Sequence, residues 1–214
     1  MSIYHWILLA GFFIFILSSL YHLFQIVKRA HTDDLSNAKG SILLGVLYSM
    51  TGAMLPMKKE TAYLHLPTYI AGILYHIGSF FALFWLIPLF FRIPLPFLFV
   101  RMSIFIFLFT GLCGFFILLK RFSNTKLRHL SSPDDYFSNI LVTAFHWMMA
   151  VALHRNTLIP HLFIVSTVLF LYIPIGKLRH IIYFFIARFY LGLFYGKRGV
   201  WPPNRRNSWA IKKL

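Results

Sequence analysis

Four histidines occupy two apolar segments of the chain, with His65 and His76 on one segment and His161 and His180 on the other. An ionisable side chain at membrane depth is costly, so such residues usually have a function. Neutral imidazole is also a common axial ligand of haem iron. Two helices that each carry two histidines could therefore hold two haems, one above the other.

The spacing of the first pair predicts that both imidazoles share one helix face. His65 and His76 are 11 residues apart, which gives three helical turns with an offset of about 20° and a rise of about 16 Å. Gly72 lies on the same face, one turn before His76. A glycine at that position lets a flat macrocycle approach the backbone.

The second pair is more widely spaced. His161 and His180 are 19 residues apart. On a regular helix they would be separated by about 28 Å along the axis, and their side chains would point about 100° apart around it. Pro174 and Gly176 lie between them, and a proline kink or a π-bulge absorbs an extra residue. Gly176 is expected to clear space for a porphyrin one turn before His180.

Composition places these segments in a membrane. The chain has 214 residues, of which 59% are hydrophobic and 12% charged. This is typical of an integral membrane protein with room for five or six spans and no separate soluble module. The net charge of +16 lies in loops and the tail, where it suits orientation and anionic lipids rather than nucleic acid.

Cys113 is the single cysteine and there is no Cys-x-x-Cys-His motif, so any haem is of the non-covalent b type.

The apolar runs predict an all-α bundle of five transmembrane helices with one short interfacial or re-entrant helix. The short helix is expected over 41–56, where Ser41, Gly45 and Ser49 form a small-residue stripe suited to close packing. The first span is interpreted as an uncleaved anchor rather than a signal peptide. The expected division is a membrane cytochrome b bundle over residues 1–190 and a basic inner-face tail over 191–214. The expected spans cover 4–27, 67–91, 97–119, 137–153 and 159–185.

Charge asymmetry predicts the orientation. With five spans and the N-terminus outside, 18 of the 21 Lys and Arg residues lie inside, and only Arg92, Arg101 and Arg155 lie outside. If 41–56 were a sixth span, 15 Lys and Arg residues would lie inside and 6 outside. The positive-inside bias therefore favours five spans and an inner C-terminus. All five acids fall in inner loops, and the absence of a carboxylate within a span counts against a proton pump.

This topology predicts the pairing of the haem ligands. The second and fifth spans are antiparallel, so His65 meets His180 at the inner edge and His76 meets His161 towards the outside. Two bis-histidine haems stacked in this way would form an electron wire. The alternatives are a single haem, or histidines that serve only as hydrogen-bonded packing residues.

Several other residues could take part. His146, in the fourth span, is expected to bond a haem propionate or a neighbouring helix, with a replacement ligand or a quinone contact as the alternatives. His5 and His22 are expected in the headgroup zone. Residues 132–135, Ser-Pro-Asp-Asp, form a helix start with a cap, a proline and two acids. The candidates for a quinone contact near the outer haem are Arg92, Arg101, His154 and Arg155. The three arginines could instead orient haem propionates, and simple contact with lipid headgroups is an equal alternative.

Two stretches, HLPTYIAGILYHIG and HLFIVSTVLFLYIPIGKLRH, resemble the gamma subunit of respiratory nitrate reductase. The inner loop KLRHLSSPDDYFSNIL resembles the wider family, which includes membrane cytochrome b subunits linked to sulfite reductase and heterodisulfide reductase. The resemblance covers about 61–180. It implies a five-span bundle with two b haems, held by His65 with His180 and by His76 with His161. Both histidine intervals are one residue longer here than in the nitrate reductase subunit.

The resemblance also implies a function. The chain would be a membrane-anchor subunit in the inner membrane of a prokaryote, exchanging electrons between the quinone pool and a soluble iron–sulfur or molybdenum partner at the basic inner face. It would be an electron-transfer subunit rather than a complete enzyme. The alternative is a haem-free scaffold that anchors a soluble partner. A small transporter or channel is a third, weaker possibility, because the sequence shows no convincing internal repeat.

Overall fold

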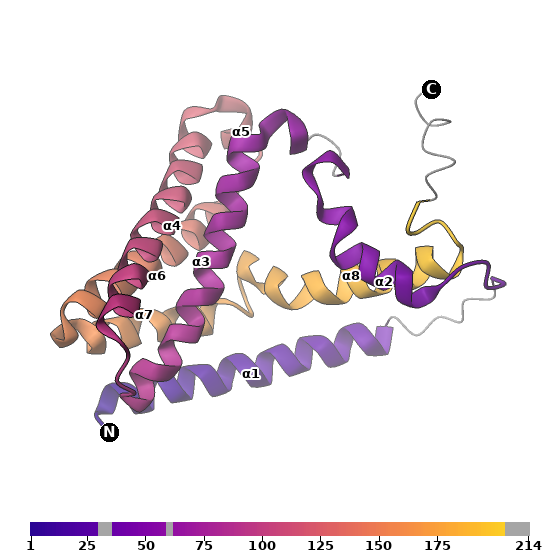
Figure 1. Ribbon diagram of the computed structural model, residues 1–214. Coiled ribbons are helices and arrows are strands. Elements are labelled where there is room, and N and C mark those ends of the chain that lie inside the picture. The colour runs from indigo at the N-terminus through magenta and orange to yellow at the C-terminus, as the bar shows by residue number, and fades with distance from the viewer. Residues whose placement is uncertain (30–35, 59–61, 204–214) are drawn as a thin grey trace. The chain divides into compact units, whose positions relative to one another are not determined.

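The computed structural model describes residues 1–29, 36–58 and 62–203, and within these residues all regular structure is helical (Figure 1). This confirms the all-α class. The α-helices are α1 Ile3–Arg29, α2 Ile42–Met50, α3 Leu66–Phe91, α4 Phe97–Ser123, α5 Thr125–His129, α6 Pro133–His154, α7 Ile159–Tyr172 and α8 His180–Lys197. Short 3-10 turns span Gly52–Met54, Pro56–Lys58, Ala62–His65, Asn156–Leu158 and Lys177–Arg179.

Four of the described helices, α1, α3, α4 and α6, are long and apolar enough to cross a membrane. A fifth span results if α7 and α8 count as one broken span. The chain therefore has the character of a multi-pass membrane protein. The N-out, C-in orientation stays a prediction.

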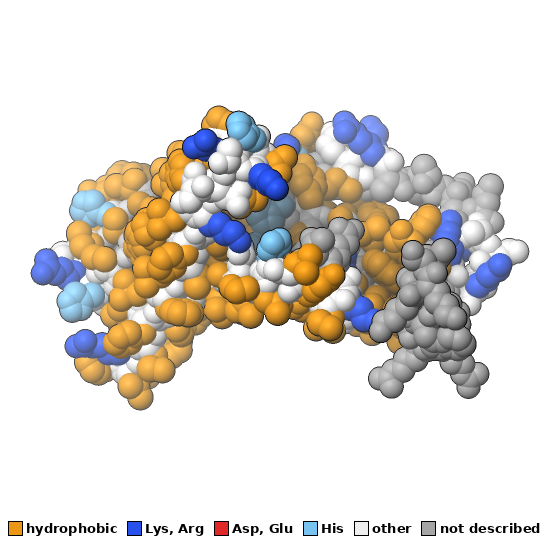
Figure 2. Space-filling model, turned by 90° about the horizontal axis from the view of Figure 1, so that it is seen from above, with side chains coloured by type: hydrophobic (Ala, Val, Ile, Leu, Met, Phe, Trp, Pro, Cys, Tyr) orange, Lys and Arg blue, Asp and Glu red, His pale blue; other side chains and the backbone are white. Residues whose placement is uncertain are grey.

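Large hydrophobic side chains are exposed along these helices. On α1, for example, Phe13, Leu17 and Phe24 are more than half exposed, at 56%, 65% and 63%. Figure 2 shows a face of the molecule on which hydrophobic side chains predominate over Lys, Arg and His. A surface of this kind suits acyl chains better than water.

The span expected over residues 159–185, with a kink or π-bulge near Pro174 and Gly176, is interrupted. α7 ends at Tyr172, and α8 starts at His180 after a turn and the 3-10 segment Lys177–Arg179. Pro174 has no N–H to donate and cannot continue a helix without a clash. The Lys177 backbone N–H donates instead to the Asp134 carboxylate on α6, at 2.9 Å. A hydrogen bond to another helix thus replaces the intrahelical pattern.

The chain forms two compact units, each described by itself. Unit 1 comprises Met1–Ser19 and Pro67–Arg179, and unit 2 comprises Leu20–Leu66 and His180–Leu214, within the described residues. The predicted boundary between a bundle over 1–190 and a tail over 191–214 stays a prediction. In the structure α8 continues to Lys197.

In unit 1, α6 packs closely on both α4 and α7. The core contains the fully buried Phe107, Phe145 and Phe163. The first half of α1 joins this unit at Gly11, where a Cβ would lie 2.8 Å from Cγ2 of Thr167 on α7. The absence of a side chain at Gly11 therefore lets α1 approach α7.

In unit 2, the short helix α2 packs on α8. The Ser41 hydroxyl caps α2 by accepting from the Leu44 N–H, and nine residues are far fewer than the ~20 needed to cross a membrane. Gly45 lies against the backbone of Gly192 and Gly196. This confirms that the small-residue stripe packs closely on another helix. The interfacial position of α2 stays a prediction.

Polar and aromatic contacts join the same helices. Arg188 on α8 donates to the Ser49 carbonyl through both Nε and Nη2, and the Ser49 hydroxyl donates to the Arg188 carbonyl at 2.6 Å. Trp201 follows α8 and contacts the rings of Tyr195 and Tyr48, with centroids at 4.7 and 5.6 Å. Trp201 therefore lies in an aromatic cluster on unit 2. Trp209 lies outside the described residues.

The glycine contact between α2 and α8 predicts a strong effect of one methyl group. A Cβ at Gly192 would lie 2.5 Å from Cα of Val46, so Gly192→Ala must push the helices apart and is expected to destabilise the protein by about 1–3 kcal/mol. Leu43→Ala on α2 is the control, because its side chain is 68% exposed. Thermal unfolding in detergent measures both. An unchanged midpoint for Gly192→Ala would contradict the observed packing.

Candidate functional site

The four predicted haem ligands occupy different kinds of position. His76 lies within α3, His161 lies in the first turn of α7, and His180 is the first residue of α8. His65 ends the 3-10 turn Ala62–His65 rather than lying on an α-helix. The shared face expected for His65 and His76 assumed α-helical geometry throughout. A 3-10 turn has three residues per turn, so the predicted offset does not hold at His65.

All four of these side chains are exposed. Each predicted pair also falls within one compact unit, with His76 and His161 in unit 1 and His65 and His180 in unit 2. In the described chain, α3 and α7 are not among the closely packed helix pairs. His76 and His161 thus lie on helices of one unit whose backbones do not pack tightly against each other.

The His76 imidazole has a defined orientation. Its Nδ1 donates to the Gly72 carbonyl, one turn earlier on α3, at 2.6 Å. Because Nδ1 carries the proton, the lone pair of the ring lies on Nε2. Metal-binding histidines commonly donate their other N–H to a backbone carbonyl, which fixes the tautomer and the ring orientation. This arrangement is suited to axial ligation through Nε2.

The two glycines predicted to make room for porphyrin behave differently. At Gly72, no neighbouring heavy atom lies within 4 Å of the position that a Cβ would occupy, so the α3 backbone is approachable beside His76. At Gly176, the Tyr172 ring occupies the space that a Cβ would need. Gly176 also lies in the break between α7 and α8, not one helical turn before His180. Its missing side chain accommodates Tyr172, which differs from the predicted role.

His146 is fully buried in unit 1 and is held by two hydroxyl groups. Its Nε2 lies 3.0 Å from the Ser79 hydroxyl of α3, and its Nδ1 lies 3.1 Å from the Thr110 hydroxyl of α4. Both ring nitrogens are therefore used by protein partners. Of the roles considered for His146, the bond to neighbouring helices is the one observed.

The hydroxyls around His146 are themselves anchored. Ser79 donates to the Tyr75 carbonyl and Thr110 donates to the Ile106 carbonyl, each at 2.8 Å. A neutral imidazole has one N–H and one lone pair. One hydroxyl therefore accepts from the ring and keeps its bond to the carbonyl, while the other can donate its single proton either to its carbonyl or to the ring. This network ties α3, α4 and α6 together. The sequence signal for this network is a serine or threonine on each neighbouring span. Residue spacing along a single helix does not show which of these residues faces His146.

Two other histidines also have protein partners. His5, which is expected in the headgroup zone, is only 6% exposed within the protein. Its ring contacts those of Phe90 and Phe163 edge-on, at centroid distances of 5.4 and 5.1 Å. The Phe90 ring of α3 and the Phe163 ring of α7 cover the imidazole. His22 is half-buried, and its Nδ1 lies 3.0 Å from the Tyr183 hydroxyl.

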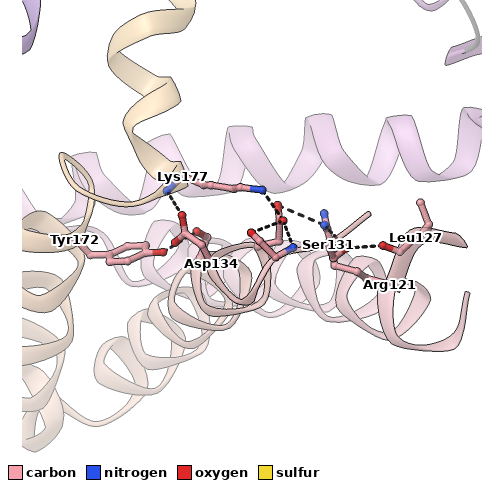
Figure 3. Close-up of polar contacts among 9 residues, drawn as sticks. Arg121, Leu127, Ser131, Asp134, Tyr172 and Lys177 are labelled. Carbon is pink, nitrogen blue, oxygen red and sulfur yellow. Dashed lines mark hydrogen bonds and ion pairs between the residues drawn. The ribbon is translucent and has the colours of Figure 1, made fainter. Parts of the chain in front are cut away.

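A polar cluster joins the start of α6 to the break before α8 (Figure 3). Asp135 lies 2.5 Å from Lys177 Nζ and 3.4 Å from Arg121 Nη1. Asp135 also accepts from the backbone N–H and the hydroxyl of Ser132, at 2.9 and 3.0 Å. α6 begins at Pro133 with Ser132 as its N-cap, so the predicted helix start is confirmed. The ion pairs to α4 and to Lys177 are a tertiary feature that the local motif does not predict.

Removing the charge of Lys177 is expected to weaken this cluster. The pair with Asp135 is partly exposed, with side-chain exposures of 50% and 15%, so Lys177→Met is expected to cost about 0.5–1 kcal/mol. The effect should shrink in high salt. Thermal unfolding measures it, with the exposed Lys126→Met as the control. If both variants unfold at the wild-type temperature, the ion pair contributes nothing measurable.

The candidates for an outer quinone contact are all exposed residues of unit 1. Arg101 lies over the Phe97 ring of its own helix, at 4.8 Å from the centroid. Arg92 follows α3 in a left-handed conformation, with φ of 54°, as at many helix C-termini. His154 ends α6, and Arg155 caps it. No described contact joins these four residues into one site.

The described residues contain no group of three or more His, Cys, Asp or Glu side chains arranged to hold a metal ion. Axial ligation of haem requires only two histidines, so this finding concerns other metal centres. Compared with models of protein families, with curated proteins and with solved structures, the chain gives no match. The resemblance to the nitrate reductase gamma family therefore stays a prediction.

Proposed function

We propose that the chain is a dihaem membrane cytochrome b subunit, which exchanges electrons between the quinone pool and a soluble iron–sulfur or molybdenum partner. His76 and His161 would bind one b haem, and His65 and His180 the other. The observation that carries the proposal is the geometry at His76, where Nδ1 donates to the Gly72 carbonyl at 2.6 Å and the adjacent backbone is open.

The contrast among the histidines supports this assignment. His146 and His5 are buried, and protein groups surround both rings. The side chain of His76 is exposed in the middle of an apolar helix, where an ionisable group is costly. A porphyrin would cover this side chain and use its lone pair. The haems would supply the one-electron chemistry, while the protein sets their position, burial and axial ligands.

The charge distribution supports the placement of the partner. On the five-span topology, the inner face holds 18 of the 21 Lys and Arg residues, which suits an inner prokaryotic membrane with its cytoplasmic face towards an acidic partner surface. Within unit 1, Asp134 and Asp135 are already engaged by Lys177. The net positive charge of this face would attract an acidic surface of a soluble redox subunit.

A haem-free scaffold is the second candidate. The observation that favours it is His146, whose buried imidazole is held within the bundle by the Ser79 and Thr110 hydroxyls. On this alternative, the exposed histidines would contact lipid or a partner helix.

Optical spectroscopy of the purified membrane protein separates the two candidates. A reduced-minus-oxidised spectrum with a b-type α band, together with about two haems per chain, is expected. Addition of a quinol should then reduce part of this haem. A protein that is folded and monodisperse but lacks the α band would support the scaffold and refute the cytochrome.

A further inference from the structure

The connection between α4 and α6 in unit 1 is a basic segment. Residues 120–131 contain four Lys or Arg residues and no Asp or Glu. α4 and α6 are both long and apolar enough to cross a membrane, so the segment that joins them lies at a membrane surface, whichever side of the membrane that is. Clusters of Lys and Arg next to a membrane span attract anionic lipid headgroups.

A surface groove lies where this basic segment meets the start of α6. Its volume is about 620 Å³, which falls in the range for small-molecule sites, roughly 300–1,000 Å³. Basic and hydroxyl side chains line one part of the groove, and apolar side chains line the other. The lining residues are Arg128, Ser131, Pro133, Tyr136, Phe137 and Ile140.

The apolar part of the groove is a stripe along α6. Pro133, Phe137 and Ile140 recur at i, i+4 and i+7, so they share one face of the helix. Seven residues of α-helix rise about 10 Å, which carries the stripe from the helix start into the span. Phe137 and Ile140 are 48% and 49% exposed. An exposed apolar stripe of this kind suits the upper part of an acyl chain.

The polar wall of the groove is held in place by contacts with α4. The Ser131 hydroxyl donates to the Leu127 carbonyl at 2.6 Å and accepts from Arg121 Nη1 at 2.9 Å (Figure 3). The Tyr136 ring packs on that of Phe122, with centroids 4.6 Å apart. These contacts fix the short helix α5 and the Tyr136 ring beside each other.

Arg128 and Tyr136 supply hydrogen-bond donors to the groove. Arg128 is exposed and makes no ion pair with any residue that the structure describes. The Asp135 carboxylate pairs instead with Lys177 and Arg121. Within the described part of the chain, the Tyr136 hydroxyl has no hydrogen-bond partner either. A guanidinium and a neighbouring hydroxyl are suited to the oxygens of a phosphodiester.

We infer that this groove binds an anionic phospholipid, with its phosphodiester at Arg128 and Tyr136 and an acyl chain along Phe137 and Ile140. The groups occur in the order that a lipid requires, because the cation lies at the membrane surface and the apolar stripe runs into the span. An acidic soluble protein would complement Arg128 but leave the stripe uncovered. The site depends on the membrane character of the chain and requires neither haem nor a redox partner.

The test is photolabelling of the full chain in phosphatidylcholine nanodiscs that contain a phosphatidylglycerol with a diazirine in one acyl chain. Mass spectrometry should find the label within 133–140. Arg128→Gln should decrease labelling at limiting probe about fivefold. Lys126→Gln removes the same charge from α5 outside the lining of the groove, and it should label as the wild type does. Tyr136→Phe removes one hydrogen-bond donor and should also decrease labelling.

Thermal unfolding in phosphatidylcholine alone checks that each variant is folded, and Tyr136→Phe tests the site independently of any change in charge. Three results would overturn the lipid site. Equal labelling of Arg128→Gln and Lys126→Gln would indicate general attraction to a basic loop. Equal labelling by a diazirine phosphatidylcholine would remove the selectivity for an anionic lipid. Displacement of the probe at constant ionic strength by inorganic phosphate or by a polyglutamate peptide would assign the groove to a soluble anion or to an acidic protein.

Discussion

Replacing His76 with leucine is expected to remove one of two b haems and leave the other in place. The imidazole that donates from Nδ1 to the Gly72 carbonyl would lose its axial bond through Nε2, and a leucine side chain cannot replace it. Haem per chain should fall by about half in a pyridine haemochrome assay. A redox titration should lose one of its two components.

The same loss is expected for His161→Leu, because His161 is the proposed partner of His76. His65→Leu and His180→Leu should each remove the other haem. His129→Leu, at the end of α5, is the control and should retain both. If His76→Leu and His161→Leu deplete different haems, the pairing is wrong, and if neither changes the haem content, these residues are not ligands.

Replacing His146 with alanine is expected to damage the fold rather than the cofactor. This change leaves a void in a fully buried site and removes the partners of Ser79 and Thr110. The combined cost of the void and of the lost hydrogen bonds is about 3 kcal/mol. Thermal unfolding should show a large decrease, while the fraction that remains folded keeps both haems.

A conservative variant sharpens this second prediction. His146→Gln retains a donor and an acceptor near the two hydroxyls, so it should recover part of the lost stability. A His146→Ala protein that unfolds normally but lacks a haem would contradict the packing role and would make His146 a ligand.

Hydropathy and local motifs predicted most of the helices. The spans expected at 4–27, 67–91 and 97–119 correspond to α1, α3 and α4, because long apolar runs have few alternatives to a helix in a membrane. The Ser132–Pro133 start of α6 and the glycine contact of α2 were also predictable, since capping and close packing depend on residues near each other in sequence or on small size alone.

Features that depend on distant residues were not predictable. A kink at Pro174 was expected, but the hydrogen bond from the Lys177 N–H to Asp134, 43 residues earlier, was not. The hydroxyl partners of His146 lie on two other helices, 36 and 67 residues away. Periodicity along one helix contains no information about such contacts. It also could not distinguish the 3-10 turn at His65 from the first turn of α3.

The candidate site also contains features that the sequence predicted and features that it did not. Residue type and apolar context identified them, and the exposure and orientation of His76 agree with the chemistry expected of a ligand. The role given to Gly176 assumed a helical turn between Gly176 and His180, whereas the Tyr172 ring fills the space beside Gly176.

The most direct measurement is an experimental density map of the protein purified from its membrane with its cofactors. The proposal predicts a flat macrocycle beside Gly72, with a central metal bound on one side by Nε2 of His76 and on the other by His161. Density beside His76 that fits only lipid acyl chains or protein side chains would contradict it.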